Sequence, residues 1–205
     1  MPTIYVETNF VVGYAFSQRT KHENILGAAK NRKIRLRIPE VCIMEAYAAI
    51  DRKLNDYNVL ANEIRARVKQ LRRSGSSPAA NTAVGSLESA QLDLAAVGAD
   101  VLTRRDVVLQ SLSEHAAFFS IECGWFVDPA RRTLIDSPRD SLIADAIIAD
   151  GQKSPFEALY YTENSSDFDT PSVRAALLIS STKLTGDINV AVAYAEGRRS
   201  WMSLA

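Results

Sequence analysis

Cysteine and histidine are scarce in this chain, which has two of each among 205 residues. Both cysteines, Cys42 and Cys123, lie in apolar stretches, so we expect two buried thiols in a reducing compartment and no disulfide framework. Together with His22 and His115 they do not supply the ligand pattern of a zinc site. Any metal ion bound by this chain would therefore be held by oxygen atoms.

The sequence also lacks a long hydrophobic run, a net charge and the basic start of a signal peptide. No stretch approaches the roughly 18 apolar residues that span a bilayer, so we predict a cytoplasmic protein without membrane partners. The 24 basic and 24 acidic residues cancel, which excludes a general electrostatic attraction to nucleic acid but allows a local basic path. Hydrophobic residues make up 47% of the chain, which excludes a disordered protein.

Alternating apolar runs predict an α/β fold with a parallel sheet. Strands are expected at residues 3–6, 34–38, 159–162 and 183–185, and helices at 22–33, 41–54, 137–151 and 187–195. Between them, residues 55–75 continue helical and turn basic, a Gly-Ser-Ser-Pro stretch at 75–78 marks a turn, and 79–119 predict one or two long helices. We therefore predict a single domain over residues 1–205 with an enlarged helical insertion near 56–130.

Four acidic residues follow these predicted strands or begin nearby helices. Glu7 follows the first strand, Glu45 lies in the helix after the second, Asp140 lies in the first turn of a helix, and Asp167 follows the 159–162 strand. Ligands of parallel sheets bind beyond the carboxyl ends of the strands, so we expect these carboxylates to meet there. Mg²⁺ and Mn²⁺ prefer such oxygen ligands, and they activate water for attack on phosphodiesters.

The order of these motifs resembles that of the PIN domain family, which includes VapC-like toxins and many ribonucleases. The matching segments are Val6-Glu7-Thr8-Asn9-Phe10, Ile43-Met44-Glu45, Asp140-Ser141-Leu142-Ile143-Ala144 and Thr162-Glu163-Asn164-Ser165-Ser166-Asp167-Phe168. The resemblance implies a three-layer fold around a parallel sheet and a metal-dependent endoribonuclease using Mg²⁺ or Mn²⁺. The chain departs from the family pattern at Glu7, where Asp is usual, and the added methylene changes the expected metal spacing.

The resemblance also implies roles for individual residues and partners. It implies catalytic roles for Glu7, Glu45, Asp140 and Asp167, metal ligation by Glu7, Asp140 and Asp167, and supporting roles for Thr8, Asn9, Asn164 and Asp169. The implied substrate is RNA, and a toxin role would add an antitoxin partner; a homodimer is a further expectation. The alternative function is a catalytically weak PIN-fold module that binds RNA or protein.

Each acid also has a structural interpretation. Glu7 can cap the following helix, Asp140 can complete a capping box begun by Ser137, and Asp167 and Asp169 can serve a turn. Glu45 is different because its neighbours are apolar, and an unpaired carboxylate is costly there. The interpretation as a metal site therefore depends on the four acidic residues taken together.

Two further choices concern the same acids. Asp140 and Asp145 lie about 140° apart around a helix, so they do not share a face, and the family's helix length selects Asp140. Asp167-Phe168-Asp169 resembles the Asp-x-Asp of haloacid dehalogenase phosphatases, but it lies late in the chain and does not directly follow a strand. The metal-dependent nuclease is therefore the preferred hypothesis.

A local basic path is predicted on the helix of the sixties. Arg65, Lys69, Arg72 and Arg73 fall at positions i, i+4, i+7 and i+8, and therefore on one helix face. Such a face can follow a nucleic-acid backbone, although a solvated helix face has the same pattern. We predict nucleic-acid binding by this face.

Overall fold

A computed structural model describes residues 1–16, 21–75, 77–126, 129, 133–154 and 156–204 of the chain. Its centre is a sheet of five parallel strands in the order β3-β2-β1-β4-β5. The strands are β1 (Thr3–Tyr5), β2 (Arg35–Pro39), β3 (Ala116–Phe119), β4 (Ala158–Tyr161) and β5 (Thr182–Thr185). The predicted α/β fold with a parallel sheet is confirmed.

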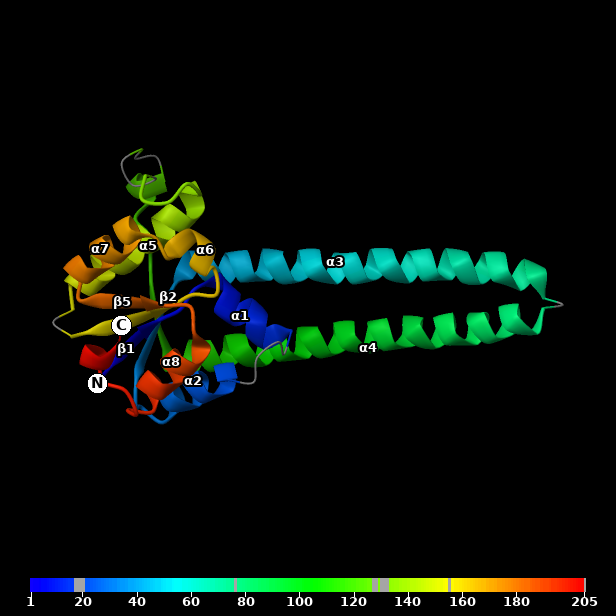
Figure 1. Cartoon of the computed structure of the whole chain (residues 1–205), viewed down its shortest axis with the longest axis horizontal. Coiled ribbons are helices and arrows are strands. Elements are labelled where there is room, and N and C mark those ends of the chain that lie inside the picture. The colour runs from blue at the N-terminus through cyan, green and yellow to red at the C-terminus, as the bar shows by residue number, and fades with distance from the viewer. Residues whose placement is uncertain (17–20, 76, 127–128, 130–132, 155, 205) are drawn as a thin grey trace.

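Helices cover both faces of this sheet (Figure 1). They are α1 (Thr8–Ala15), α2 (Lys21–Lys30), α3 (Glu40–Leu71), α4 (Pro78–His115), α5 (Pro138–Gln152), α6 (Ser165–Phe168), α7 (Pro171–Ile179) and α8 (Ile188–Ala195). Short 3-10 turns lie at Arg72–Ser74, Cys123–Phe126 and Trp201–Ser203. α5 packs with α7 on one face and α2 with α8 on the other, an arrangement consistent with a three-layer PIN-like fold.

The central strand β1 lies inside the core because helices cover both of its faces. Ile4 pairs in register with Leu36 of β2 and Leu159 of β4, and all three side chains are buried. Near-continuous apolar runs are typical of strands buried on both faces, which is why β1 and β4 could be predicted from sequence. This burial places the end of β1, and with it Glu7, inside the molecule.

α3 and α4 form an antiparallel hairpin that extends well beyond the sheet (Figure 1). At 1.5 Å per residue the two helices are about 48 Å and about 57 Å long. We call residues 51–104 the arm and the rest of the chain the body. In the described part of the arm, only Val68, Ala80 and Val101 are buried, whereas Ile50, Val108 and Leu112 at its base have no exposed surface. The arm therefore stands largely outside the core.

Two predicted boundaries were wrong. Residues 116–119, predicted as helix, form β3, which pairs in parallel with β2 through Leu36 and Ala116. A four-residue apolar run does not distinguish a strand from a buried helix, so its secondary structure depends on pairing with β2. The long helical segment therefore ends at His115. Residues 165–168, for which no helix was expected, form the short helix α6.

The expectations about cysteines and membranes have separate outcomes. Cys42 is buried and free, as predicted, whereas the side chain of Cys123 lies outside the described part of the structure. No helix within the described ranges has the length and apolar character needed to cross a membrane.

Candidate functional site

A cavity of about 180 Å³ lies where β1 leads into α1, beside the start of α5. Its lining includes six residues singled out from the sequence, namely Glu7, Glu45, Asp140, Thr8, Asn9 and Asn164. Three of the four predicted catalytic carboxylates therefore share one cavity, although their positions in the chain lie far apart. Asp167 and Asp169 are not among its lining residues.

Glu7 lies at the centre of this arrangement and is only 4% exposed. It is the N-cap of α1, because its Oε2 accepts a hydrogen bond from the backbone N–H of Asn9 at 2.9 Å. Its Oε1 accepts from the Oγ1 hydroxyl of Thr162 at 3.1 Å. The predicted cap is therefore real, and the same carboxylate also lines the cavity.

Burial raises the pKa of Glu7 to about 7 from its ordinary value of 4.5. The negative charges of Asp140 and Glu163 raise it further, while the hydrogen bonds from Asn9 and Thr162 oppose the rise. A carboxyl group with such a pKa changes its charge near neutral pH. A cation placed beside it would favour the ionised form.

Glu45 is held by partners on both of its oxygens. The Oγ1 hydroxyl of Thr8 donates to Oε2 at 2.7 Å, and the Nε of Arg139 lies 3.3 Å from Oε1. One turn later on α3, Ala48 and Ala49 line the same cavity with small side chains, which leave its space open. The carboxylate in the apolar stretch is therefore paired and directed toward the cavity.

Asp140 begins α5 and is 6% exposed. Its backbone N–H donates to the Oγ of Ser137, the N-cap residue, at 3.4 Å, so Ser137 provides the side-chain cap. The carboxylate of Asp140 lines the cavity and contributes to the raised pKa of Glu7. Asp145, the alternative on the same helix, is not among the lining residues.

Two arginines of the cavity were missed by the sequence analysis. The Nε of Arg139 lies 3.3 Å from Glu45 and 3.4 Å from Asp140, so its guanidinium lies between the two carboxylates. Arg52 lies seven residues after Glu45, close to two helical turns, and therefore on the same face of α3. That spacing was a usable signal for Arg52. Nothing in the sequence indicated the direction of the Arg139 side chain.

Asp167 is exposed on α6 and connects to the cavity through other residues. Its carboxylate accepts from the side-chain amide of Asn164 at 2.8 Å. The backbone N–H of Asn164 donates to Thr162 Oγ1 at 3.0 Å, and Thr162 in turn donates to Glu7. Asp167 therefore anchors a chain of hydrogen bonds that ends on the buried carboxylate.

Asp169, predicted as a supporting residue, is directed elsewhere. Its exposed carboxylate pairs with Arg174 of α7, and that hydrogen bond holds the pKa of Asp169 below its ordinary value. This contact ties the end of α6 to α7. It fits the alternative interpretation of Asp169 as a turn residue.

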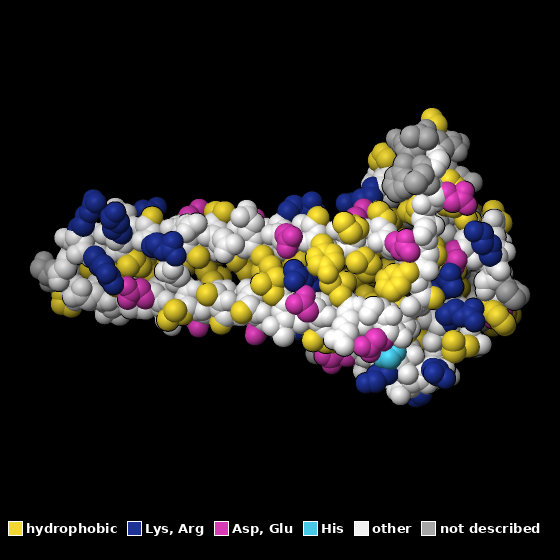
Figure 2. Space-filling view, turned by 180° about the vertical axis from the view of Figure 1, so that it is seen from behind, with side chains coloured by type: hydrophobic (Ala, Val, Ile, Leu, Met, Phe, Trp, Pro, Cys, Tyr) yellow, Lys and Arg dark blue, Asp and Glu magenta, His cyan; other side chains and the backbone are white. Residues whose placement is uncertain are grey.

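The predicted basic residues lie on the arm, away from the cavity. Arg65 follows Glu45 by 20 residues on the same helix, a separation of about 30 Å along its axis. Arg72 pairs with Glu88 of α4 at 2.5 Å, and Figure 2 shows Lys and Arg side chains gathered near the far end of the arm. Any nucleic acid that contacted both regions would have to extend along the arm.

The cavity provides oxygen donors, the type of ligand that Mg²⁺ and Mn²⁺ prefer. Its carboxylates are those of Glu7, Glu45 and Asp140. Glu7 and Asp140 repel each other when both are ionised, and a bound cation would neutralise their negative charge. Among the described residues, however, no group of three or more His, Cys, Asp or Glu side chains is arranged to hold a metal ion. The donors therefore fit the predicted metal in chemistry, while Arg139 supplies positive charge between two of them.

Comparisons of the chain with protein-family models, curated proteins and solved structures give no match. The residues of the cavity therefore carry the evidence on function.

Proposed function

We propose that this protein is a metal-dependent endoribonuclease that hydrolyses RNA phosphodiesters at the cavity formed by Glu7, Glu45 and Asp140. What supports the proposal most is the burial of Glu7, a carboxylate whose pKa is raised to about 7 beside a second carboxylate, Asp140. Placing charges of one sign together in a buried site costs stability. Such arrangements cluster at functional sites, where a ligand compensates for the cost.

The proposed cofactor is Mg²⁺ or Mn²⁺, which when bound would polarise a phosphate and lower the pKa of a water molecule. Glu7 and Asp140 would hold the ion, and Glu45 would hold it or orient a bound water. Thr8 would keep Glu45 in position through its 2.7 Å hydrogen bond. The ligand role expected for Asp167 remains a prediction, and its contact with Asn164 gives it a positioning role as well.

The proposal includes membership of the PIN family, which the four motifs support, and a cytoplasmic location. A toxin role would require an antitoxin protein as partner. Growth arrest on expression, relieved by the product of a neighbouring gene, would separate a toxin from a housekeeping nuclease.

Cleavage of labelled single-stranded RNA, with Mn²⁺ or Mg²⁺ against EDTA, tests the chemistry directly. We expect cleavage that depends on metal and that Asp140→Asn reduces by about 100-fold or more, because a ligand to the ion is lost. Asp145→Asn is the matched control, since it makes the same change on the same helix outside the cavity lining. Full activity in both Asp140→Asn and Glu7→Gln would refute the site.

A second candidate function, a catalytically weak module, is favoured by one observation. The guanidinium of Arg139 lies within 3.4 Å of Asp140 and 3.3 Å of Glu45, where it offsets their charge without a metal. Thermal unfolding with and without Mn²⁺ separates the two candidates, because a ligand of the folded state raises the melting temperature. If the protein is a nuclease, Mn²⁺ should raise the melting temperature of the wild type. If Arg139 neutralises the site of a weak module, Mn²⁺ should raise the melting temperature only of the Arg139→Ala variant.

A further inference from the structure

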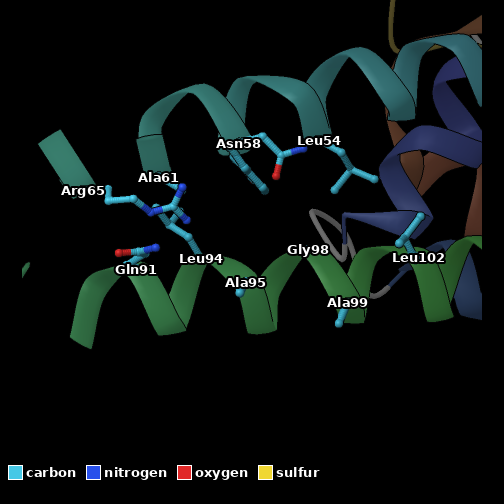
Figure 3. Close-up of a pocket in the computed structure, with 11 residues that line it drawn as sticks. Leu54, Asn58, Ala61, Arg65, Gln91, Leu94, Ala95, Gly98, Ala99 and Leu102 are labelled. Atoms are coloured by element: carbon cyan, nitrogen blue, oxygen red, sulfur yellow. The ribbon is translucent and has the colours of Figure 1, made fainter. Parts of the chain in front are cut away.

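The arm has a groove between its two helices (Figure 3). The groove has a volume of about 440 Å³; Leu54 and Leu102 lie at its end nearer the body, and Arg65 and Gln91 lie at its other end (Figure 3). Between them the lining includes Ala61 of α3 and Ala95 and Gly98 of α4. Because these side chains are small, the two helices leave space between them where a longer side chain would close the seam.

A large apolar residue lies exposed beside this groove. Leu92 is 73% exposed and precedes Ala95 and Ala99 of the groove by three and seven residues, so it lies on the same face of α4. Figure 2 shows hydrophobic side chains following the seam between the arm helices. Two helices alone bury only one narrow stripe each, and contiguous apolar surface of this kind marks an interaction site.

The outer part of α3 and the facing helix α4 carry opposite charges. Residues 64–73 contain no acid and five basic residues, Arg65, Arg67, Lys69, Arg72 and Arg73. Residues 78–103 contain no Lys or Arg and three acids, Glu88, Asp93 and Asp100. The ion pair between Arg72 and Glu88 already joins the two signs within one chain. A second copy of the same arm offers an acidic helix to the basic one, and by two-fold symmetry the reverse contact forms as well.

One face of the arm is large enough for a stable interface. Residues 78–104 of α4 extend for about 40 Å, and two adjacent helices are about 20 Å wide. Such a face offers about 800 Å², which is the area that a standard interface buries on each partner.

We propose that two copies of this chain pair arm to arm in a four-helix bundle, with α3 of each copy beside α4 of the other. The arms run parallel, so that both bodies lie at the same end. Arg65 lines the groove together with Gln91, so the basic part of α3 then lies level with Glu88 and Asp93 of the other copy. The second copy covers the groove and its exposed apolar rim. This inference does not depend on the proposed nuclease activity.

Sedimentation equilibrium of the full chain over a range of concentrations tests the pairing. We expect a dimer for the wild type, and we expect Ala99→Glu to raise its dissociation constant by about 100-fold or more. Ala99 lines the groove and is exposed in the single chain, so the substitution leaves the fold intact but buries two carboxylates in the dimer. Ala96→Glu is the matched control, because Ala96 is exposed on the same helix but does not line the groove.

Charge reversal tests the arrangement of the helices. One variant carries Arg65→Glu with Lys69→Glu in α3, and a second carries Glu88→Lys with Asp93→Lys in α4. Each variant alone brings like charges together and should lose at least about tenfold in affinity, whereas a mixture of the two should form a heterodimer. Circular dichroism confirms that both variants remain helical.

Three outcomes would overturn the proposal. The first is a wild-type monomer at every concentration, which would leave the groove to a helix of a different protein. The second is a dimer that Ala99→Glu and Ala96→Glu affect equally. The third is a mixture of the charge-reversed variants that associates no better than each variant alone.

Discussion

Folded proteins usually expose polar side chains and bury apolar ones. The body departs from this arrangement by burying acidic side chains, and the arm departs from it by exposing apolar ones. The body buries Glu7 and Asp140 beside each other, whereas the arm leaves Leu92 and Leu60 in solvent. Both departures cost free energy in the isolated chain, since buried charge and exposed apolar surface are each unfavourable. The two proposals therefore assign different ligands to the two regions, a cation to the body and a protein surface to the arm.

The largest expected effect concerns the chemistry of the body and leaves the arm unchanged. Asp140→Asn should reduce metal-dependent RNA cleavage by about 100-fold or more while the dimer dissociation constant stays at its wild-type value. Ala99→Glu should do the reverse and leave cleavage by each chain unchanged. Cleavage and sedimentation are measured on both variants. If either substitution altered both the cleavage rate and the dimer dissociation constant, the body and the arm would not act independently.

Packing provides the next contrast, because α4 carries the same residue type in both regions. Leu112 has no exposed surface at the base of α4, whereas Leu92 on the arm is 73% exposed. We expect Leu112→Ala to lower the free energy of unfolding by about 3 kcal/mol, since it leaves a cavity in the core. Leu92→Ala should change it by less than about 0.5 kcal/mol in the monomer.

Urea unfolding of both leucine variants, at concentrations too low for pairing, measures the two values. A large loss of stability for Leu92→Ala under these conditions would mean that the arm has a core of its own within one chain.

The sequence predicted some features of the body and not others, for a physical reason. The convergence of Glu7, Glu45 and Asp140 on one cavity could be predicted because strand ends and helix starts meet at one edge of a parallel sheet. The side-chain direction of Arg139 depends on the contact between α3 and α5, which is set by tertiary packing. Local sequence does not encode that contact.

A strand of the body shows the limits of local patterns in another way. The arm helices were predicted, but β3 was not, because Ala116-Ala117-Phe118-Phe119 is too short to distinguish strand from helix without its partner β2. The basic face from Arg65 to Arg73 was also predicted as a surface pattern. Its separation of about 30 Å from Glu45 follows only from the straight course of α3.

The pH dependence of stability should reveal the buried charge of the body. The pKa of Glu7 is raised from 4.5 to about 7 in the folded state. Between these values the folded chain holds a proton that the unfolded chain has released, so the free energy of unfolding falls as pH rises through this window. The full loss, reached above pH 7, is about 3 kcal/mol by linkage, an upper value for one group.

Glu7→Gln should remove this slope, because the amide stays neutral, and should make the protein more stable than wild type at pH 8. Urea unfolding in EDTA from pH 4 to pH 8 measures the slope without metal. Equal slopes in the two proteins would show that Glu7 does not carry the buried charge.

The smallest expected effect is on the surface of the arm, where the Arg72–Glu88 pair measures 2.5 Å but has side chains 65% and 44% exposed. The body has a comparable ion pair between Arg37 and Asp150, which are 2.6 Å apart and only 21% and 15% exposed. The hydroxyl of Tyr5 also donates a hydrogen bond to Asp150. Arg72→Ala should change the free energy of unfolding of the monomer by less than about 0.5 kcal/mol, because solvent and salt screen an exposed pair. Arg37→Ala should cost about 2 kcal/mol, since it leaves a partly buried carboxylate without its cation. Urea unfolding at low and high salt distinguishes the two, and an equal cost for both substitutions would mean that the arm's charges are as shielded from water as those of the body.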